Sequence, residues 1–347
     1  MLERIKEWSA SPWTTDNFPQ FGLSTYNYHS DGSGISSSSR RRPIFTMRST
    51  VISYPGVPGS GCRHFPADSH LWYWLTTKGY EFDVITDDEL HKYGLAAIEK
   101  YSVLLTCSHP EYHTPQSLNA LQEYTNTGGH LMYLGGNGFY WKVAVREVWP
   151  DAVEIRRGEG GIRAWASEPG EYYNAFDGEY GGLWRRNGRA PQVLAGVGFT
   201  SQGDHYGAPY RRTPESYSNE CAWVFEGITE EIIGDFGLSG GGAAGFELDR
   251  ADTMLGTPLN AVTLASSEGH DDSFVLVPED ILTHHDTWPH KPIKDLIRAD
   301  IVYFETAKGG GVFSVGSITF CGSLPHNNCE NNISKMVENV IRKFLSN

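Results

Sequence analysis

Hydrophobic and polar positions follow their most regular pattern between about residues 64 and 142. Apolar side chains recur at helical spacing behind Asp68, and Lys78-Gly79 supplies the glycine that commonly ends a helix. Residues 80–85 alternate in the manner of a short strand, and Thr86 begins a further helical turn. The pattern therefore predicts a helix, a strand and a second helix in this order.

A strand–helix–strand unit follows directly. Residues 101–107 form an apolar run with a β-branched residue, which is typical of a buried parallel strand. Thr114-Pro115 places proline at the first position of a helix, and Gly128-Gly129 ends that helix before the apolar residues 130–134. Because such crossovers join parallel strands, we expect the two strands to run in the same direction.

The periodicity weakens along the second half of the chain. Residues from about 150 to 250 are dense in Trp, Tyr, Arg and Gly, and we interpret them as a long insertion that covers the site. Strand signals return at residues 260–265 and in a hairpin over residues 299–321, and Asn331 or Asn332 caps a final amphipathic helix.

Together these elements predict an α/β protein with a mostly parallel sheet flanked by helices. Residues 1–42 are rich in Ser, Gly, Thr and Asn and are expected to form an irregular N-terminal segment. Residues 43–347 are expected to form one α/β domain that carries the insertion at about 150–250.

Composition and charge narrow the class of partner and the compartment. The net charge of −14 argues against nucleic acid and anionic membranes as main partners, because both need a basic footprint. The five cysteines are scattered and form no C-x-x-C pair, which fits free thiols in a reducing compartment. The first residues lack the apolar core of a signal peptide, and no apolar run approaches the ~18 residues of a membrane span. We therefore expect a soluble, cytoplasmic protein.

Polar side chains with chemical potential follow the two predicted parallel strands. One strand ends in Cys107-Ser108-His109-Pro110-Glu111-Tyr112-His113 and the next in Leu134-Gly135-Gly136-Asn137-Gly138. In open α/β sheets, ligands bind at the carboxyl ends of strands. The spacing of His109, Glu111 and His113 suits a metal or acid–base cluster, and it equally suits a polar loop in which Glu111 caps the helix at Thr114.

Other motifs allow a functional and a plainer interpretation. Cys107 is a nucleophile candidate, but its neighbours are not the glycines of a strained elbow, which favours a buried strand cysteine. Tyr26 and Tyr28 would share one face of an extended segment, although Asp31-Gly32 indicates a turn. Glu247 follows a glycine run, and spacing alone favours a surface turn there. Two further candidates are the basic triplet Arg40–Arg42, which is either a grip for an acidic partner or a solvated loop, and the weaker metal candidate His284-His285-Asp286.

Taken in order, several motifs resemble the C-terminal catalytic region of the large subunit of N,N-dimethylformamidase. They cover nearly the whole chain, and the ordered set is more specific than any one of them. The motifs are T-Y-N-Y-H-S-D-G-S-G (25–34), S-S-R-R-R-P (38–43), F-D-V-I-T-D-D-E-L-H (82–91), S-H-P-E-Y (108–112), G-G-N-G-F-Y-W (135–141), G-F-E-L-D-R (245–250) and V-F-S-V-G-S-I (312–318).

The resemblance implies a class I glutamine-amidotransferase-like α/β domain with a mononuclear iron (Fe3+) held by two tyrosines and one glutamate. On matching positions Glu111 is the metal carboxylate and Tyr26 one metal tyrosine, with Tyr28 a less favoured choice in the same motif. Hydrolysis of N,N-dimethylformamide to dimethylamine and formate is the implied reaction. The positions of His109, Asn137 and Glu247 match those of catalytic and supporting residues.

Further expectations concern the roles of these residues. Glu247 is expected to act as general base on water, and Asn137 to donate to the developing oxyanion. His109 is expected to orient the metal carboxylate or to carry a proton to the leaving amine. The aromatic run Phe139-Tyr140-Trp141 suits either a pocket for two N-methyl groups or core packing.

The resemblance also departs from the family at one point. The other metal tyrosine of the family lies farther upstream than this chain reaches before Tyr26, and the N-terminal domain of the large subunit is absent. We therefore expect a C-terminal half, with a small subunit and a homo-oligomer as possible partners. The alternative is a non-catalytic amidotransferase-like domain that binds a small ligand or a subunit and is inactive without an upstream segment. A cysteine amidotransferase acting through Cys107 is the third reading, and it lacks the glycines of its elbow.

Overall fold

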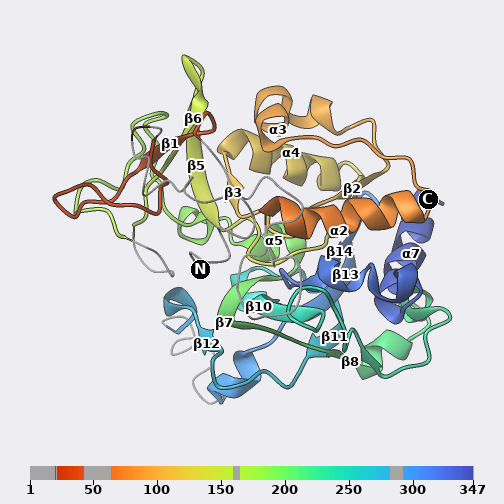
Figure 1. Cartoon of the computed structure of the whole chain (residues 1–347). Coiled ribbons are helices and arrows are strands. Elements are labelled where there is room, and N and C mark those ends of the chain that lie inside the picture. Colours follow the sequence, from red (N-terminus) through yellow and green to blue (C-terminus); the bar gives the residue numbers. More distant parts are fainter. Residues whose placement is uncertain (1–19, 21, 43–63, 159–164, 282–291, 347) are drawn as a thin grey trace.

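The computed structural model describes residues 20, 22–42, 64–158, 165–281 and 292–346. Within these ranges the strands form three sheets (Figure 1). The largest has the order β2 (Val103–Leu105), β4 (His130–Tyr133), β14 (Gly311–Ser314), β13 (Asp300–Glu305), β11 (Val262–Ser267), β8 (Tyr210–Arg212) and β9 (Ile232–Ile233).

Two smaller sheets complete the described strands. One has the order β1 (Ser37–Ser39), β6 (Trp149–Ile155), β5 (Trp141–Arg146) and β3 (Tyr112–His113). The other has the order β10 (Ala244–Arg250), β7 (Gly198–Ala208) and β12 (Val275–Leu276).

The prediction of a mostly parallel, glutamine-amidotransferase-like sheet is wrong. In the largest sheet only β2, β4 and β14 run parallel to one another, and every later pair is antiparallel. The physical reason is the length of the connections. β13 turns into β14 across a few residues that end in Gly309 and Gly310, which is too short for the crossover that parallel neighbours need.

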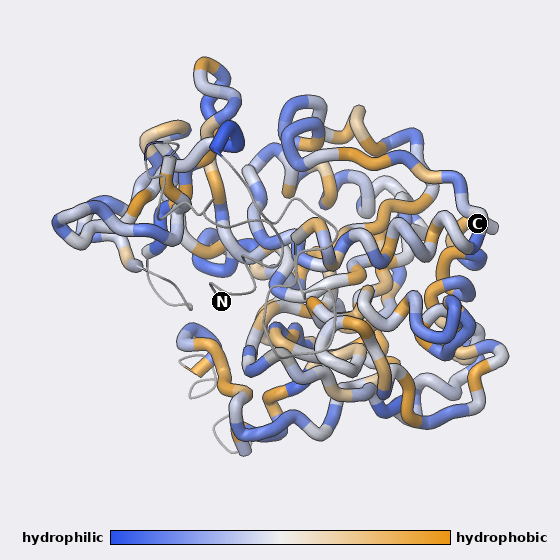
Figure 2. The backbone as a smooth tube through the Cα atoms, in the orientation of Figure 1, coloured by the Kyte–Doolittle hydropathy of each residue, from blue (hydrophilic) through white to orange (hydrophobic). Residues whose placement is uncertain are grey.

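Helices cover both faces of the parallel part of the sheet. They are α2 (His64–Thr77), α3 (Asp87–Tyr93), α4 (Pro115–Asn126), α5 (Pro191–Ala195) and α7 (Asn332–Leu345). Met132 belongs to the core cluster with α2 and α7, whereas its neighbours Leu131 and Tyr133 belong to the cluster with α3, α4 and α5. Strand alternation therefore places two separate cores on the two faces of this sheet, and Figure 2 shows hydrophobic stretches both within the body of the molecule and along its outer segments.

Several local predictions are confirmed. β2 and β4 are parallel neighbours joined through α4, whose cap is Thr114 with proline at the start. Residues 299–321 contain the β13–β14 hairpin, and Asn331 caps α7. The strand predicted over residues 80–85 is wrong: this stretch pairs with no described strand, and most of its side chains are exposed.

The region predicted as an insertion contains most of β6 together with β7, β8, β9 and β10, and it contributes to all three sheets. Gly245 of β10 lies so close to Gly207 of β7 that a Cβ there would be 2.8 Å from the Gly207 Cα. Glycine is therefore required for this pairing, and it weakens the sequence signal of both strands. The boundaries at 42, 150 and 250 stay predictions.

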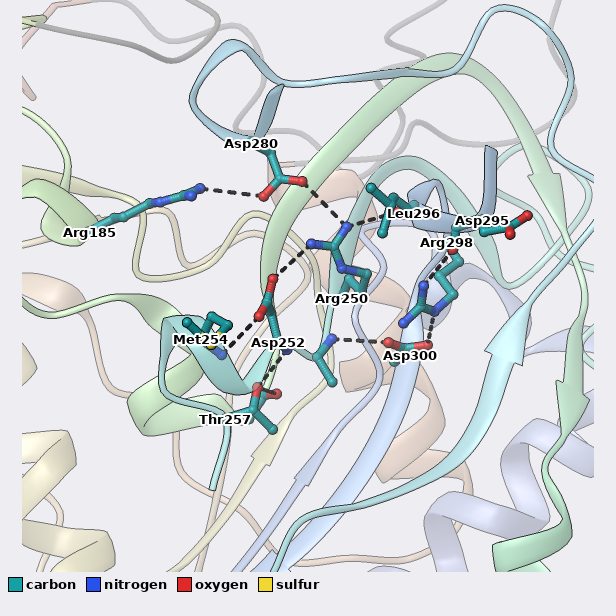
Figure 3. Close-up of polar contacts among 12 residues, drawn as sticks. Arg185, Arg250, Asp252, Met254, Thr257, Asp280, Asp295, Leu296, Arg298 and Asp300 are labelled. Atoms are coloured by element: carbon teal, nitrogen blue, oxygen red, sulfur yellow. Dashed lines mark hydrogen bonds and ion pairs between the residues drawn. The ribbon is translucent and has the colours of Figure 1, made fainter. Parts of the chain in front are cut away.

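A buried ion network fixes the end of β10 (Figure 3). Arg250 donates to Asp252 at 3.0 Å and to Asp280 at 3.3 Å, and Arg185 lies 3.6 Å from the same Asp280. All four side chains are at most 10% exposed, so each charge depends on its partners. The network therefore holds the strand that carries Glu247.

None of the helices in the described ranges is both long and apolar enough to cross a bilayer.

Candidate active site

The candidate site lies at the edge of the sheet where the parallel strands β2, β4 and β14 end. The backbone N–H of Gly136, after β4, donates to the carbonyl of Ser108, after β2, at 3.1 Å. The N–H groups of Phe139 and Tyr140 donate to Pro110 and Glu111 at 2.8 and 3.0 Å. The two strand ends named by the sequence are therefore in direct contact, as expected for parallel neighbours.

Two glycines make this contact possible. A Cβ on Gly135 would lie 2.3 Å from the Ser108 carbonyl oxygen, and one on Gly136 would lie 2.8 Å from the carbonyl oxygen of Glu247. Real side chains do not tolerate such distances, so both positions need glycine. The same close approach brings β10 onto the loop that carries Asn137.

His109 joins the two glutamates of the site. Its Nε2 lies 2.9 Å from Glu111 Oε2 and 3.1 Å from Glu247 Oε2, and all three side chains are less than 10% exposed. Burial alone would lower the pKa of His109, but the two carboxylates outweigh it and raise that pKa to about 10. The protonated imidazole is therefore favoured near neutral pH, and its Nε2 lies between the two carboxylates within ion-pair distance, without a well-aligned hydrogen bond to either among the described residues.

Asn137 occupies a strained turn beside this triad. Its backbone has φ of 52°, a left-handed conformation that asparagine tolerates better than most residues. The side chain is 5% exposed, and its Oδ1 has no hydrogen-bond partner among the described residues. An amide that rotates about its Cβ–Cγ bond presents either oxygen or NH2, so Asn137 is available to a ligand.

Tyr26 reaches the site from the N-terminal part of the chain. Its phenol oxygen is in hydrogen-bonding contact with that of Tyr112, which directly follows Glu111. Burial, followed by the negative charge of Glu111, raises the pKa of both phenols. Tyr26 as a whole is 47% exposed, so its phenol end is buried against Tyr112 and Arg157 while the rest of the residue faces outward. Tyr28, the other tyrosine of the motif, is similarly exposed at 50%, and its backbone pairs with Gly34.

Arg157 closes this end of the site. Its guanidinium lies 4.3 Å from the ring centroid of Tyr26 and 5.1 Å from that of Trp141, and the residue is fully buried. Burial would lower the pKa of Arg157, but the phenols of Tyr112 and Tyr26 outweigh it. A buried cation over an aromatic ring stabilises both groups and favours the anionic form of a nearby phenol.

The sequence did not single out Tyr112 or Arg157. Tyr112 carried one usable signal, its position next to Glu111 at a strand end, whereas nothing around Arg157 distinguishes it from a surface arginine. Their roles depend on Tyr26, which contacts Tyr112 from 86 positions away in the sequence.

The donor types at the site suit a hard metal ion. Two phenol oxygens meet, and the carboxylate of Glu111 acts electrostatically on both. Phenolate and carboxylate oxygens are ligands of hard cations such as Fe3+. Across the described residues no three His, Cys, Asp or Glu side chains are grouped to hold a metal. A metal site here would therefore depend on its tyrosines.

The remaining candidates have structural partners. His113 is buried and contacts the carbonyl of Pro110 and the hydroxyl of Ser117, so the structure does not bring it to His109 and Glu111. Burial raises the pKa of the Cys107 thiol, which makes it a poor nucleophile. Arg40 and Arg41 both pair with Asp151 of this same chain.

The last sequence candidates are the aromatic run Phe139-Tyr140-Trp141, Glu247 and the motif His284-His285-Asp286. Phe139 belongs to a core cluster with Tyr133, while Tyr140 and Trp141 pack with Phe199 in another, and all three of the run are buried. The segment around Glu247 is a wholly buried strand rather than a surface turn, because β7 and the loop after β14 cover it. His284-His285-Asp286 lies outside the described residues.

Residues 9–331 match the protein family described as N,N-dimethylformamidase beta subunit-like, C-terminal. The chain belongs to this family. It is 41% identical over 334 residues to the N,N-dimethylformamidase beta subunit of Paracoccus aminophilus and 42% identical over 334 residues to that of an Alcaligenes species. These relatives are named as a beta subunit, and their names do not describe it as large or catalytic.

The alignments cover 95% of this chain and 42% of each relative, so the chain spans about two fifths of the length of these dimethylformamidase subunits. A solved structure of a cytoplasmic protein from Salmonella typhimurium covers 80% of this chain and 86% of its own, at 11% identity and a TM-score of 0.39.

Proposed function

We propose that this chain carries the active site of a metal-dependent amidase that hydrolyses small N-alkylated formamides, with N,N-dimethylformamide giving dimethylamine and formate. The observation that carries the proposal is the meeting of Tyr26, Glu111, His109 and Glu247 at one sheet edge. The names of the two relatives support the substrate class. A partner subunit belongs to the same proposal, because the relatives are named as one subunit of an enzyme.

A mononuclear ferric ion would be held by Glu111 and Tyr26. Tyr112 is the second phenol that this chain itself offers at the same place. When bound, the ion supplies Lewis-acid polarisation of the formyl oxygen and a lowered pKa for water, which a resonance-stabilised tertiary amide requires. Arg157 offsets part of the negative charge that two phenolates and a carboxylate would bring together.

The other side chains divide the proton transfers. Glu247 accepts a proton from the attacking water, and the amide of Asn137 donates to the oxygen that becomes negative. The protonated His109 gives its Nε2 proton to the departing dimethylamine nitrogen. His109 touches both Glu111 and Glu247, so the proton taken by the base has a short path back to the imidazole.

Metal analysis and a formamide hydrolysis assay on one set of variants test this proposal. Glu111→Gln keeps the shape of the side chain and removes its charge. Glu154→Gln is the matched control, because Glu154 is also fully buried but accepts the backbone N–H groups of Ala175 and Phe176 and pairs with Arg156 rather than with His109. We expect iron and activity in the wild type and the control, and loss of both in Glu111→Gln.

Two results would count against the proposal. Iron that stays bound at wild-type stoichiometry in Glu111→Gln would remove this residue from the metal site. Iron binding in the wild type without turnover of any N-alkylated formamide would favour a ligand- or subunit-binding role instead.

A further inference from the structure

A buried carboxylate on β10, Asp249, holds the loop that carries Asn137. Its Oδ1 accepts the backbone N–H of Asn137 at 2.8 Å, and its Oδ2 accepts the hydroxyl of Tyr133 at 2.8 Å. Asp249 and Tyr133 are both fully buried. Because both side chains are shielded from water, these hydrogen bonds contribute more to stability than exposed ones.

We call the hydrogen-bonded pair Asp249 and Tyr133 the brace of this loop, and Tyr133 also holds the next residue of the loop. Its hydroxyl donates to Asp249 and accepts the N–H of Gly138 at 2.6 Å. Two consecutive amides of the loop, those of Asn137 and Gly138, are therefore held by one connected pair of side chains. The pair ties the end of β4 to β10, two elements far apart in the sequence.

The loop needs such a brace because its backbone is strained. Asn137 has φ of 52° and Phe139 has φ of 56°, and left-handed backbone is costly for a bulky residue such as phenylalanine. A conformation of this kind persists only where surrounding contacts determine it. The contacts here come from Asp249, two residues after Glu247 on the same strand.

We propose that Asp249, together with Tyr133, is a positioning residue. By holding the backbone N–H of Asn137, it fixes the place of the Asn137 side-chain amide relative to His109 and Glu247. This inference rests on the proposed role of Asn137. Strand β10 carries both the proposed general base, Glu247, and Asp249, which positions the proposed oxyanion donor, Asn137. A shift of β10 would therefore move both together and preserve their relative geometry.

Asp249→Asn and Tyr133→Phe test the brace, with Tyr124→Phe as the matched control. Tyr124 is also a buried tyrosine whose hydroxyl donates to a single partner, the carbonyl of Tyr101 at 2.9 Å, and Tyr101 precedes β2 at the opposite end of that strand from the candidate site. Hydrogen exchange of the amides of Asn137 and Gly138 is measured together with kcat and KM for N,N-dimethylformamide. Tyr133→Phe removes one oxygen atom, so it keeps the test open if Asp249→Asn fails to fold.

Both site variants are expected to speed exchange of the two amides and to lower kcat about tenfold or more with KM within about twofold, because an oxyanion donor acts mainly in the transition state. The control is expected to leave exchange in this loop and kcat unchanged. Unchanged exchange in both site variants, or a kcat equal to that of the control, would overturn the inference. A wild type without amidase activity would overturn the proposed function instead, and the exchange data would then decide the brace alone.

Discussion

The phenol oxygens of Tyr26 and Tyr112 are in hydrogen-bonding contact across 86 positions of sequence. Tyr26 lies in the segment before β1, and Tyr112 begins β3 beside Glu111. The contact therefore brings the described segment before β1 onto the ends of β2 and β4. Both phenols have raised pKa values, so an added cation would favour their ionisation, and the pair would report binding of the proposed metal ion.

The first prediction concerns the colour of the iron-loaded protein. Phenolate bound to Fe3+ gives a charge-transfer band in the visible region, so Tyr26→Phe is expected to abolish or strongly shift that band. Tyr112→Phe is expected to shift it if Tyr112 contributes the second phenol. Tyr28→Phe serves as the control, because Tyr28 lies in the same motif with nearly the same exposure as Tyr26 and its backbone pairs with Gly34. A band unchanged in Tyr26→Phe would exclude this residue as a ligand.

The second prediction concerns the proton transfers. His109→Gln and Glu247→Gln are each expected to lower kcat by roughly 10² to 10⁴-fold, the usual contribution of a positioned acid or base. Because the two side chains are in contact, the double variant is expected to lose much less than the product of the single losses. Steady-state kinetics of the three variants measure this coupling, and strictly multiplicative losses would contradict a shared proton path.

The third prediction concerns the contact between the strand ends. Gly135→Ala places a Cβ 2.3 Å from the Ser108 carbonyl and is expected to lower the free energy of unfolding by about 2 to 4 kcal/mol. Gly32→Ala is the control, because a Cβ there meets nothing within 4 Å and only its positive φ is strained. The expected cost in that variant is about 1 kcal/mol. Urea denaturation of both variants provides the comparison, and equal costs would mean that the strand ends relax without penalty.

The fourth prediction concerns pH. Burial raises the pKa of Asp249 to about 7 from an ordinary value of 3.8, so the folded protein binds a proton that the unfolded chain releases. The resulting stabilisation is complete below 3.8 and is lost as the pH rises through about 7. The wild type is therefore expected to lose stability relative to Asp249→Asn between pH 5 and pH 8 in urea denaturation. A constant difference between the two proteins over this range would contradict the raised pKa.

Local sequence signals predicted the helices and strands that begin and end at clear capping or terminating residues. Thr114-Pro115 and Gly128-Gly129 mark α4 because capping and helix termination act within a few residues, and the β2–β4 pair followed from it. Glu111 and Asn137 were indicated in the same way, as polar residues at strand ends, and their roles stay predictions. These signals need no knowledge of the rest of the chain.

Long-range pairing was beyond those signals. The prediction of a mostly parallel sheet was wrong because tertiary contacts, rather than local propensity, select antiparallel partners such as β11 and β13. β10 was hidden because glycines reduce its strand signal where it meets β7. Glu247 was indicated only by family resemblance, and Arg157 by nothing, since the aromatic rings beneath it come from other parts of the chain.

The wide spacing of the site residues has a consequence for how the protein acquires its chemistry. Tyr26, Glu111, Asn137 and Glu247 meet only after pairings between distant parts of the chain have formed, and contacts of such high sequence separation are slow to close. Any form of the chain in which these pairings are missing would therefore lack the site. A ligand that binds only the finished site would stabilise the entire cooperative unit rather than one segment. Binding of a ligand at the proposed site would thus report the completion of folding.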